Sequence, residues 1–234
     1  MISIHQSQFL SWSPFYYKAI MSDTFVVLDD VQFQKNGVQN RNLIKTPQGE
    51  LWLTIPLKQH NLDTPINKIF VSNVSVYEKI LKTIEMSYKK CSSFDGVFRI
   101  LEGCLSPKNE KLHDLNNELF LDALKFLDSH PKLFYSSQMD TVCKKDDLVI
   151  ELIKKTGDNE YLSGSGALSY MNLDKFKKES IKVYVYKFNY SPYKQLWDNK
   201  VGFIGNLSII DLLFNEHINA KKYLLENGSI SRII

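Results

Sequence analysis

The chain has 234 residues, of which 44% are hydrophobic and 24% charged, an ordinary composition for a globular protein with a sizeable core. Its formal net charge of +3 is spread along the chain, so the sequence offers no basic face of the kind that binds nucleic acid. The three cysteines lie at unrelated spacings without a C-x-x-C pair, which argues against a zinc ribbon and a disulfide framework.

No apolar run approaches the roughly 20 residues that a membrane helix needs. The N-terminus also lacks the basic and apolar regions of a secretory leader. We therefore expect a cytoplasmic protein that does not insert into a membrane. The sequence does not indicate its oligomeric state.

The first half of the chain predicts strands, two separate helices and a hairpin. In chain order these are a strand over Ile2–Gln6, a helix over Pro14–Met21, a strand over Thr24–Leu28, a hairpin of Val38–Lys45 and Leu51–Leu57, a strand over Lys68–Ser72 and a helix after Ser75. Proline suits the first helical turn, Thr46-Pro-Gln-Gly49 is typical of a β-turn, and Ser75 with Glu78 predicts a capping box.

The second half alternates helices with strands. In chain order we predict a helix over Lys111–Asp128, a strand over Leu133–Tyr135, a helix over Asp146–Thr156, a strand at Glu160–Leu162, a short helix to about Lys178, a strand over Ile181–Phe188, a helix from Ser208 to about Glu216 and a last helical turn between Asn219 and Gly228. This alternation predicts an α/β fold, in which a mainly parallel central sheet is flanked by helices and a β-hairpin is inserted in the N-terminal half. We expect one domain over residues 1–234, with a possible subdivision into 1–105 and 106–234.

The first candidate site is the end of the opening strand. Ligands of open α/β sheets bind beyond the carboxyl ends of the strands, and His5 and Gln6 lie at such an end. An imidazole can act as a general base near neutral pH, and the amides of Gln6 and Gln8 can orient a ligand. The alternative is a capped strand end with a structural histidine.

The second candidate site follows the next strand, where the adjacent carboxylates Asp29 and Asp30 precede amide and basic side chains. The binding residues that we predict there are Gln32, Lys35, Asn40 and Arg41. Adjacent carboxylates on an extended chain point opposite ways, so one of the two is expected to face a site. The cluster suits a polar ligand such as a nucleotide sugar, and arginine recognises phosphate or carboxylate. We predict no metal, because two carboxylates without a histidine are not a distinctive metal site. A polar loop of caps and turns is the alternative.

The third candidate site is a glycine- and serine-rich turn between a strand and a helix. We predict that Ser163, Gly164, Ser165 and Tyr170 bind ligand there, because backbone N–H groups at a helix N-terminus suit an anion. The turn is neither a Walker A motif nor a dinucleotide fingerprint. The alternative is a tight strand-to-helix turn without a ligand.

A fourth polar group lies near the C-terminus. Asn206, Ser208 and Asp211 are expected chiefly to start a helix, with ligand binding by Asn206 as the alternative. The remaining histidines are isolated in the sequence, and we expect surface or structural positions for them. They are His60, His113, His130 and His217.

Six stretches of the sequence resemble, in the same order, the WbqC-like family. They are Ile4–Trp12, Phe25–Phe33, Gln39–Asn42, Trp52–Pro56, Tyr161–Gly164 and Phe203–Asn215. Each motif is weak alone, but together they are specific and cover nearly the whole chain. The family usually has proline where this chain has Ser7, Ser11 and Gly205, which affects loop stiffness more than chemistry.

Members of this family look like products of O-antigen and capsule gene clusters, which make lipopolysaccharide and other surface polysaccharides. Some of these clusters make amino sugars that carry acyl or amino-acid groups. The resemblance therefore implies a transferase that forms an amide on the amine of a nucleotide-linked amino sugar, using an activated acyl donor. In this hypothesis His5, Asp29 or Asp30 serves as catalytic group, and Arg41 or the Ser163–Gly166 turn holds phosphate.

Two alternatives remain open. An ATP-dependent carboxylate–amine ligase would form the same bond, and a non-catalytic nucleotide-sugar binding or assembly protein would need the same polar pocket without a base. All three hypotheses require that the end of the opening strand, the acidic pair and the glycine-serine turn lie around one hollow.

Overall fold

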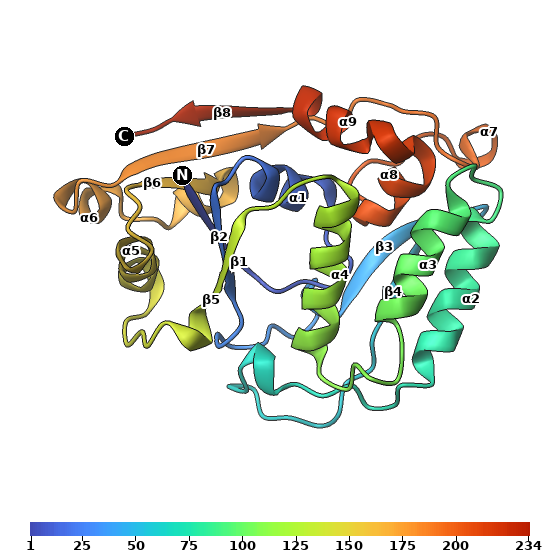
Figure 1. Cartoon of the computed structure of the whole chain (residues 1–234), viewed down its shortest axis with the longest axis horizontal. Coiled ribbons are helices and arrows are strands. Elements are labelled where there is room, and N and C mark those ends of the chain that lie inside the picture. Colours follow the sequence, from blue (N-terminus) through green and yellow to red (C-terminus); the bar gives the residue numbers. More distant parts are fainter.

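A six-stranded sheet organises the chain, and the computed structural model describes all of residues 1–234 (Figure 1). The strands are β1 (Ile2–Gln6), β2 (Thr24–Leu28), β5 (Lys132–Tyr135), β6 (Glu160–Gly164), β7 (Lys182–Phe188) and β8 (Gly228–Arg232). Their spatial order is β5-β2-β1-β6-β7-β8; the first five are parallel and β8 runs antiparallel to β7. This is the strand order of a doubly wound sheet, and the predicted α/β class with its mainly parallel sheet is confirmed.

Helices cover both faces of the sheet because its strands alternate between two apolar cores. Phe25 and Val27 of β2 pack with α1 (Ser13–Ile20), α4 (Leu112–Phe126) and α8 (Ile209–Glu216). Val26 faces the other way and packs with α5 (Lys145–Lys155) and α6 (Leu173–Lys178). The remaining helices are α2 (Val76–Tyr88), α3 (Phe94–Cys104), α7 (Asp198–Val201) and α9 (Ala220–Asn227), with 3-10 turns at η1 (Ile66–Lys68), η2 (Ser136–Gln138), η3 (Ser165–Ser169) and η4 (His217–Asn219).

The inserted hairpin is also confirmed. Strands β3 (Arg41–Thr46) and β4 (Gly49–Thr54) form a separate antiparallel pair. Gly49 has a φ of +110°, a conformation that glycine adopts at no steric cost, and the hydroxyl of Thr46 donates to the Gly49 carbonyl at 2.9 Å. In Figure 1 the hairpin lies beyond α4 as seen from β5 and β2.

Two local predictions in the first half are wrong. Residues 68–72 form no strand, because their contacts are the isolated bridges of Val71 with Leu57 and of Phe70 with Lys111. The capping box at Ser75 does not form either. Ser75 already has helical dihedral angles, and its backbone N–H donates to the side chain of Asn73 at 2.9 Å.

Several elements escape prediction, among them α3, α7 and β8. The helix α3 contains two glycines, which lower its helix propensity; it forms because Val97, Leu101 and Cys104 are buried in the main core. Gly228 follows the last residue of α9, as expected, but it also starts β8, which completes the sheet beside β7. The helix starting after Ser208 is confirmed, with the Ser208 hydroxyl accepting from the Ile210 N–H.

A buried ion pair fixes the C-terminal segment to the hairpin. The ammonium of Lys45, whose side chain is fully buried, donates to Asp198 at 2.6 Å and to Gln195 at 2.9 Å. Asp211 lies in the first turn of α8, as expected, and is also buried, where it accepts from Tyr193 and Gln195. Burial raises the pKa of the Asp211 carboxyl despite these hydrogen bonds.

We expect Lys45→Met to lower the free energy of unfolding by about 2–3 kcal/mol. Loss of one partner from a fully buried pair costs roughly 3–5 kcal/mol, and Asp198 keeps part of its hydration. Urea unfolding followed by tryptophan fluorescence measures the change. Lys182→Met is the matched control, because both side chains of the Lys182–Glu160 pair are partly exposed to solvent, and this substitution should cost at most about 1 kcal/mol. Equal effects of the two substitutions would contradict this account of Lys45.

Candidate functional site at the carboxyl edge of the sheet

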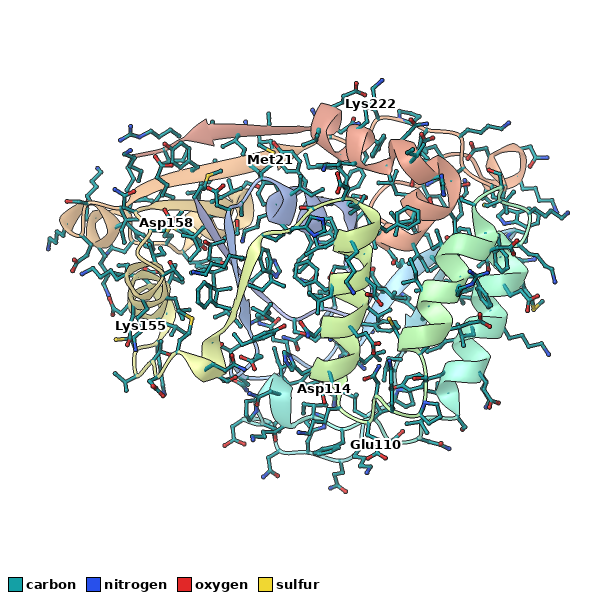
Figure 2. All side chains as sticks on the ribbon, viewed as in Figure 1. Met21, Glu110, Asp114, Lys155, Asp158 and Lys222 are labelled. Atoms are coloured by element: carbon teal, nitrogen blue, oxygen red, sulfur yellow. The ribbon has the colours of Figure 1, made fainter.

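The polar residues of the candidate site lie at one edge of the sheet. Strands β1, β2 and β5 are parallel neighbours, so their carboxyl ends lie side by side. β1 ends with His5 and Gln6, Asp29 follows β2, and Ser136 follows β5. The opposite edge is marked by Asp158, which pairs with the amino terminus at 3.0 Å. Figure 2 labels Asp158 at that edge and Asp114, in the first turn of α4, at the other.

Asp29 is a buried carboxylate held by four hydrogen bonds. It accepts from the Ser137 hydroxyl at 2.7 Å, the Ser137 N–H at 3.0 Å, the Ser136 hydroxyl at 3.1 Å and the Asn67 amide at 3.4 Å. Burial alone would raise the pKa of Asp29, but the bonds from Ser137 and the nearby His113 outweigh it, and the pKa lies below its ordinary value. Asp29 is therefore a fixed anion.

Asp30 differs from its neighbour in exposure. Its side chain is open to solvent while Asp29 is buried, in line with the expected alternation. The two carboxylates nonetheless converge on one residue, because the Ser136 hydroxyl also contacts Asp30.

One face of α4 supplies the groups that complete the site. His113, Asn116 and Asn117 lie at helical positions i, i+3 and i+4, which share a face. His113 Nε2 lies 3.8 Å from an Asp29 oxygen, and the Tyr135 hydroxyl donates to Asn117 at 2.6 Å. The rings of His113 and Tyr135 meet edge to face. The expectation of a surface or satisfied position is therefore wrong for His113, whose Nδ1 is buried without a partner.

The two histidines of the site differ in electrostatic surroundings. Burial, together with the charge of Lys18, lowers the pKa of His5 to about 3. Burial also lowers the pKa of His113, and the charge of Lys111 adds to that shift, while the carboxylates of Asp29 and Asp114 oppose it. Both pKa values lie below the ordinary value, so both imidazoles are neutral at pH 7. His113 is the more suitable base of the two, because carboxylates lie beside it and favour the protonated form.

A polar pocket opens between the end of β1 and α4. It has about 220 Å³ of space, part of it open to solvent, and is lined by Ser7, Gln8, Phe15, Val27, Asn116, Asn117 and Phe120. Four of these side chains are polar, and the other three are two aromatic rings and a valine. Gln8 is also 3.5 Å from His5 Nδ1, so the predicted first candidate site borders this pocket.

Gln39 joins the loop after β2 to this pocket. Its amide donates to Gln6 Oε1 at 2.8 Å and accepts from the Gln34 N–H at 2.6 Å. Its backbone carbonyl accepts from the Asn116 amide at 2.8 Å. Gln39 is buried, and it fixes the end of β1, the loop and α4 relative to one another.

The other residues predicted after β2 lie outside the pocket lining. Gln32 donates to the Leu62 carbonyl, and Asn40 to the Ile55 carbonyl. Arg41 donates to the Asn36 carbonyl and stacks on Trp52 at 4.6 Å. Lys35 is exposed. Gln32, Asn40 and Arg41 thus donate their hydrogen bonds to backbone carbonyls and not into the pocket.

The glycine-serine turn lies at the end of β6, on the other side of β1. Ser163 is buried and Gly164 lies against the Tyr186 hydroxyl. The helix that follows is the short 3-10 turn η3, which carries Ser165, while Tyr170 beyond it is 76% exposed. A short 3-10 turn lacks the aligned dipoles of the α-helix on which the anion prediction relied. Asn206, at φ +49°, accepts from Tyr190 beyond the end of β7.

Strand β1 separates from β6 just before this turn. β1 pairs with β2 over five residues but with β6 only at Ile2 and Ser3. The carbonyl of Ile4, the next residue, accepts from the buried ammonium of Lys18 at 2.7 Å. Burial lowers the pKa of Lys18 to about 7. β1 and β6 are parallel, and the order of the strands along the sheet reverses between them, which is where doubly wound sheets bind ligands.

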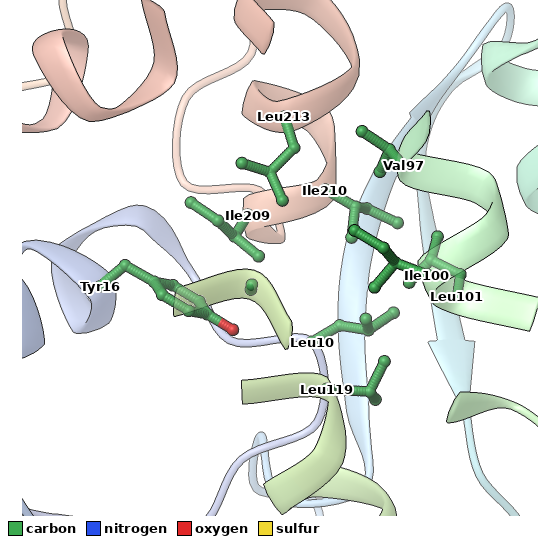
Figure 3. Close-up of a pocket in the computed structure, with 10 residues that line it drawn as sticks. Leu10, Tyr16, Val97, Ile100, Leu101, Leu119, Ile209, Ile210 and Leu213 are labelled. Atoms are coloured by element: carbon green, nitrogen blue, oxygen red, sulfur yellow. The ribbon is translucent and has the colours of Figure 1, made fainter. Parts of the chain in front are cut away.

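A second cavity is apolar. It encloses about 320 Å³, and all ten residues that line it are hydrophobic, among them Leu10, Leu119 and Ile210 (Figure 3). Figure 3 shows the Tyr16 hydroxyl as the one oxygen among the drawn side chains. Such a cavity offers no set of convergent polar groups, so we place the candidate site at the polar pocket.

One group of side chains has the spacing of metal ligands. Cys104, Glu118 and Asp122 have ligand atoms within 4.8 Å of one another, between α3 and α4. Lys108 pairs with Glu118, and Lys125 pairs with Asp122 at 2.7 Å. Burial raises the pKa of the Cys104 thiol well above its ordinary value. The group is therefore a protonated thiol with two carboxylates already neutralised by lysines.

The fold and this edge together define a doubly wound α/β protein with a polar site at the carboxyl ends of its strands. The chain belongs to the WbqC-like protein family, whose sequence model matches residues 6–223, and the resemblance read from the motifs is confirmed. It is also similar to the uncharacterized protein Rv1507c of Mycobacterium tuberculosis, with 29% identity over 226 residues, covering 95% of this chain and 96% of the relative. No solved structure matches significantly. None of the helices combines the length and the apolar character needed to cross a membrane.

The lowered pKa of Lys18 predicts a pH dependence of stability. Between pH about 7, where the folded chain releases the proton, and the ordinary value of 10.5, the unfolded chain binds more protons, so the free energy of unfolding rises with pH. Lys18→Met removes this contribution. Urea unfolding of both proteins at several pH values should show the wild type gaining stability relative to the variant as the pH rises. A constant difference across that window would contradict the buried, unpaired ammonium.

Proposed function

We propose that this protein is a transferase of bacterial surface-polysaccharide biosynthesis that forms an amide on the amine of a nucleotide-linked amino sugar. The observation that supports it best is the buried Asp29–His113 pair beside a pocket lined by amide side chains at the end of β1. An amine acceptor needs a base that removes its proton and polar groups that orient it. The family resemblance supplies the biosynthetic context.

His113 is the general base in this proposal, and Asp29 is its orienting partner. Asp29 accepts several hydrogen bonds and its pKa lies below its ordinary value, so it is a poor base but a stable counter-charge. His113 Nε2 lies 3.8 Å from an Asp29 oxygen, which is longer than a hydrogen bond. In the proposal this gap closes when substrate binds, which places the proton on Nε2 and leaves the lone pair on Nδ1, the atom without a partner in the free protein.

The reaction is an acyl transfer from an activated donor, for which we take a thioester. The amine nitrogen attacks the carbonyl carbon, so an N–C bond forms and the C–S bond breaks. The thiolate leaves with the bonding electrons. The proton lost by the amine passes to His113 and then to the thiolate, which returns the imidazole to its neutral form.

The nucleotide part of the substrate would lie in the crevice between β1 and β6. That is the position at which a doubly wound sheet binds nucleotides, and the Ser163–Gly166 turn borders it. In this arrangement Gln6 lies between the crevice and the amide-lined pocket, and its bond to Gln39 sets its orientation.

We expect His113→Gln to lower kcat/KM about 10²–10⁴-fold, the usual contribution of a general base. The assay follows thiol release from an acyl thioester in the presence of a UDP- or dTDP-linked amino sugar. His130→Gln is the matched control, because His130 is exposed and pairs only with an exposed aspartate. If His5→Gln abolishes a turnover that His113→Gln leaves intact, the base is His5.

Two further measurements separate the alternative functions. Release of pyrophosphate from ATP with a free carboxylic acid would indicate a ligase. Binding of the nucleotide sugar that raises the melting temperature, without turnover of any donor, would indicate a binding protein and would contradict the proposed transferase.

A further inference from the structure

The amide-lined pocket contains buried polar atoms that have no partner. Ser7 Oγ, Gln8 Oε1 and Asn116 Oδ1 are all buried and unbonded, and all three residues line the same pocket. Ser7 is 5% exposed and Asn116 only 1%. Buried polar atoms in native proteins are almost always hydrogen-bonded, so a group of three without partners in one pocket points to a ligand.

The orientation of Asn116 is fixed by its other amide atom. Its Nδ2 donates to the Gln39 backbone carbonyl at 2.8 Å. The flipped amide would place Oδ1 against that carbonyl, two acceptors in contact, and is therefore excluded. The atom that Asn116 presents to the pocket is an acceptor.

The Ser7 hydroxyl, which has no partner either, can serve as a second acceptor. The amide of Gln8 is less firmly fixed in orientation, because His5 Nδ1 donates to the Gln6 carbonyl at 3.1 Å and the Gln8 atom 3.5 Å from that nitrogen is better placed as an acceptor. Asn117 accepts from Tyr135, which leaves its N–H groups as donors. No lysine or arginine lines the pocket, so an anion would meet acceptors without a counter-charge. The fixed anion Asp29 lies next to His113, one helical turn along α4 from Asn116.

We propose that this pocket is the subsite for a primary amine, held by Asn116 and Ser7. An ammonium group offers three N–H donors and can bond both acceptors at once, whereas a hydroxyl offers one. When the amine has given one proton to a base, two N–H donors remain for the two acceptors. The inference rests on the proposed function for the molecule that carries the amine, while the chemistry of the pocket is independent of turnover.

The direct test is titration of the full-length protein with glucosamine, glucose and N-acetylglucosamine. These sugars carry an amine, a hydroxyl and an amide at the same carbon. The side-chain amide signal of Asn116 in a ¹⁵N spectrum, assigned by its absence from Asn116→Leu, reports binding at the pocket. We expect glucosamine to bind about tenfold or more tightly than the other two, since tenfold corresponds to about 1.4 kcal/mol. Equal binding of glucose would overturn the amine assignment and indicate a hydroxyl subsite.

Two substitutions at one position test the pocket-facing oxygen. Asn116→Leu removes that oxygen together with the donation to Gln39, and we expect it to weaken glucosamine binding about tenfold or more. Asn116→Asp keeps an acceptor in the pocket but places a second oxygen against the Gln39 carbonyl, so it should lower the melting temperature and still bind glucosamine more tightly than Asn116→Leu. Wild-type affinity in Asn116→Leu would overturn the inference. Calorimetry measures both affinities.

Ser7→Ala gives a second test that does not depend on tolerance at Asn116. Because Ser7 Oγ has no partner in the free protein, its removal should leave the melting temperature unchanged or raise it. Glucosamine affinity should fall severalfold. A lower melting temperature with unchanged affinity would mean that the hydroxyl is structural, and would contradict a ligand role.

These experiments distinguish failure of the subsite from failure of the enzyme. If glucosamine perturbs Asn116 and no donor is turned over, the amine subsite stands and the transferase proposal falls. If acyl transfer occurs and Asn116→Leu leaves the KM for the amino sugar unchanged, the transferase stands and the subsite is overturned.

Discussion

The separation of β1 from β6 is the constraint on which the site depends. A parallel strand normally satisfies its backbone groups on both sides, but β1 pairs with β6 only at Ile2 and Ser3. The Ile4 carbonyl accepts from Lys18 instead, at 2.7 Å. Since a lone buried polar group costs free energy, this contact makes it possible for the end of β1 to part from β6 while His5 and Gln6 stay paired with β2. Ser7 and Gln8, which follow the strand, then line the pocket.

Two buried polar networks in this protein differ in how completely they are satisfied. Around Asp211, the carboxylate accepts from Tyr88, Tyr193 and Gln195, and every partner is accounted for. At the pocket, Asn116 and Ser7 leave acceptors unbonded. A satisfied network makes a structure rigid, whereas unsatisfied buried atoms destabilise it unless something binds them. The first network therefore supports the fold, and the second is where ligand chemistry belongs.

The sequence predicts one side of the site and misses the other. His5, Gln6 and Asp29 are predictable because they follow apolar strands, and neighbouring parallel strands bring their carboxyl ends together. His113 and Asn116 are not, because the Lys111–Asp128 stretch reads as an amphipathic helix whose leucines define the buried face. Their burial comes from packing of the first turns of α4 against the loop at Gln39, a contact between residues 77 positions apart. The signal that could have found them is a histidine with two asparagines on one helical face.

Predictions from local pattern fail where tertiary contacts decide the outcome. The glycines of α3 argue against a helix, yet packing of Val97 and Leu101 into the core forms one. Residues 68–72 have the composition of a strand, but no neighbouring strand is placed to pair with them over more than isolated bridges. In the glycine-serine turn the sequence correctly places a strand before Gly164, but not the 3-10 geometry that follows.

The size of the pocket limits what it can hold. It has at most about 220 Å³, part of it open to solvent, which is less than the roughly 300–1,000 Å³ that encloses a whole small-molecule ligand. The pocket therefore suits one functional group of a ligand. In the proposed function, the rest of the nucleotide-linked sugar lies outside it along the carboxyl edge, toward the place between β1 and β6 where the strand order reverses. Binding energy gained there, far from the reacting nitrogen, would hold the amine against Asn116 and within reach of His113, which is how remote contacts contribute to catalysis.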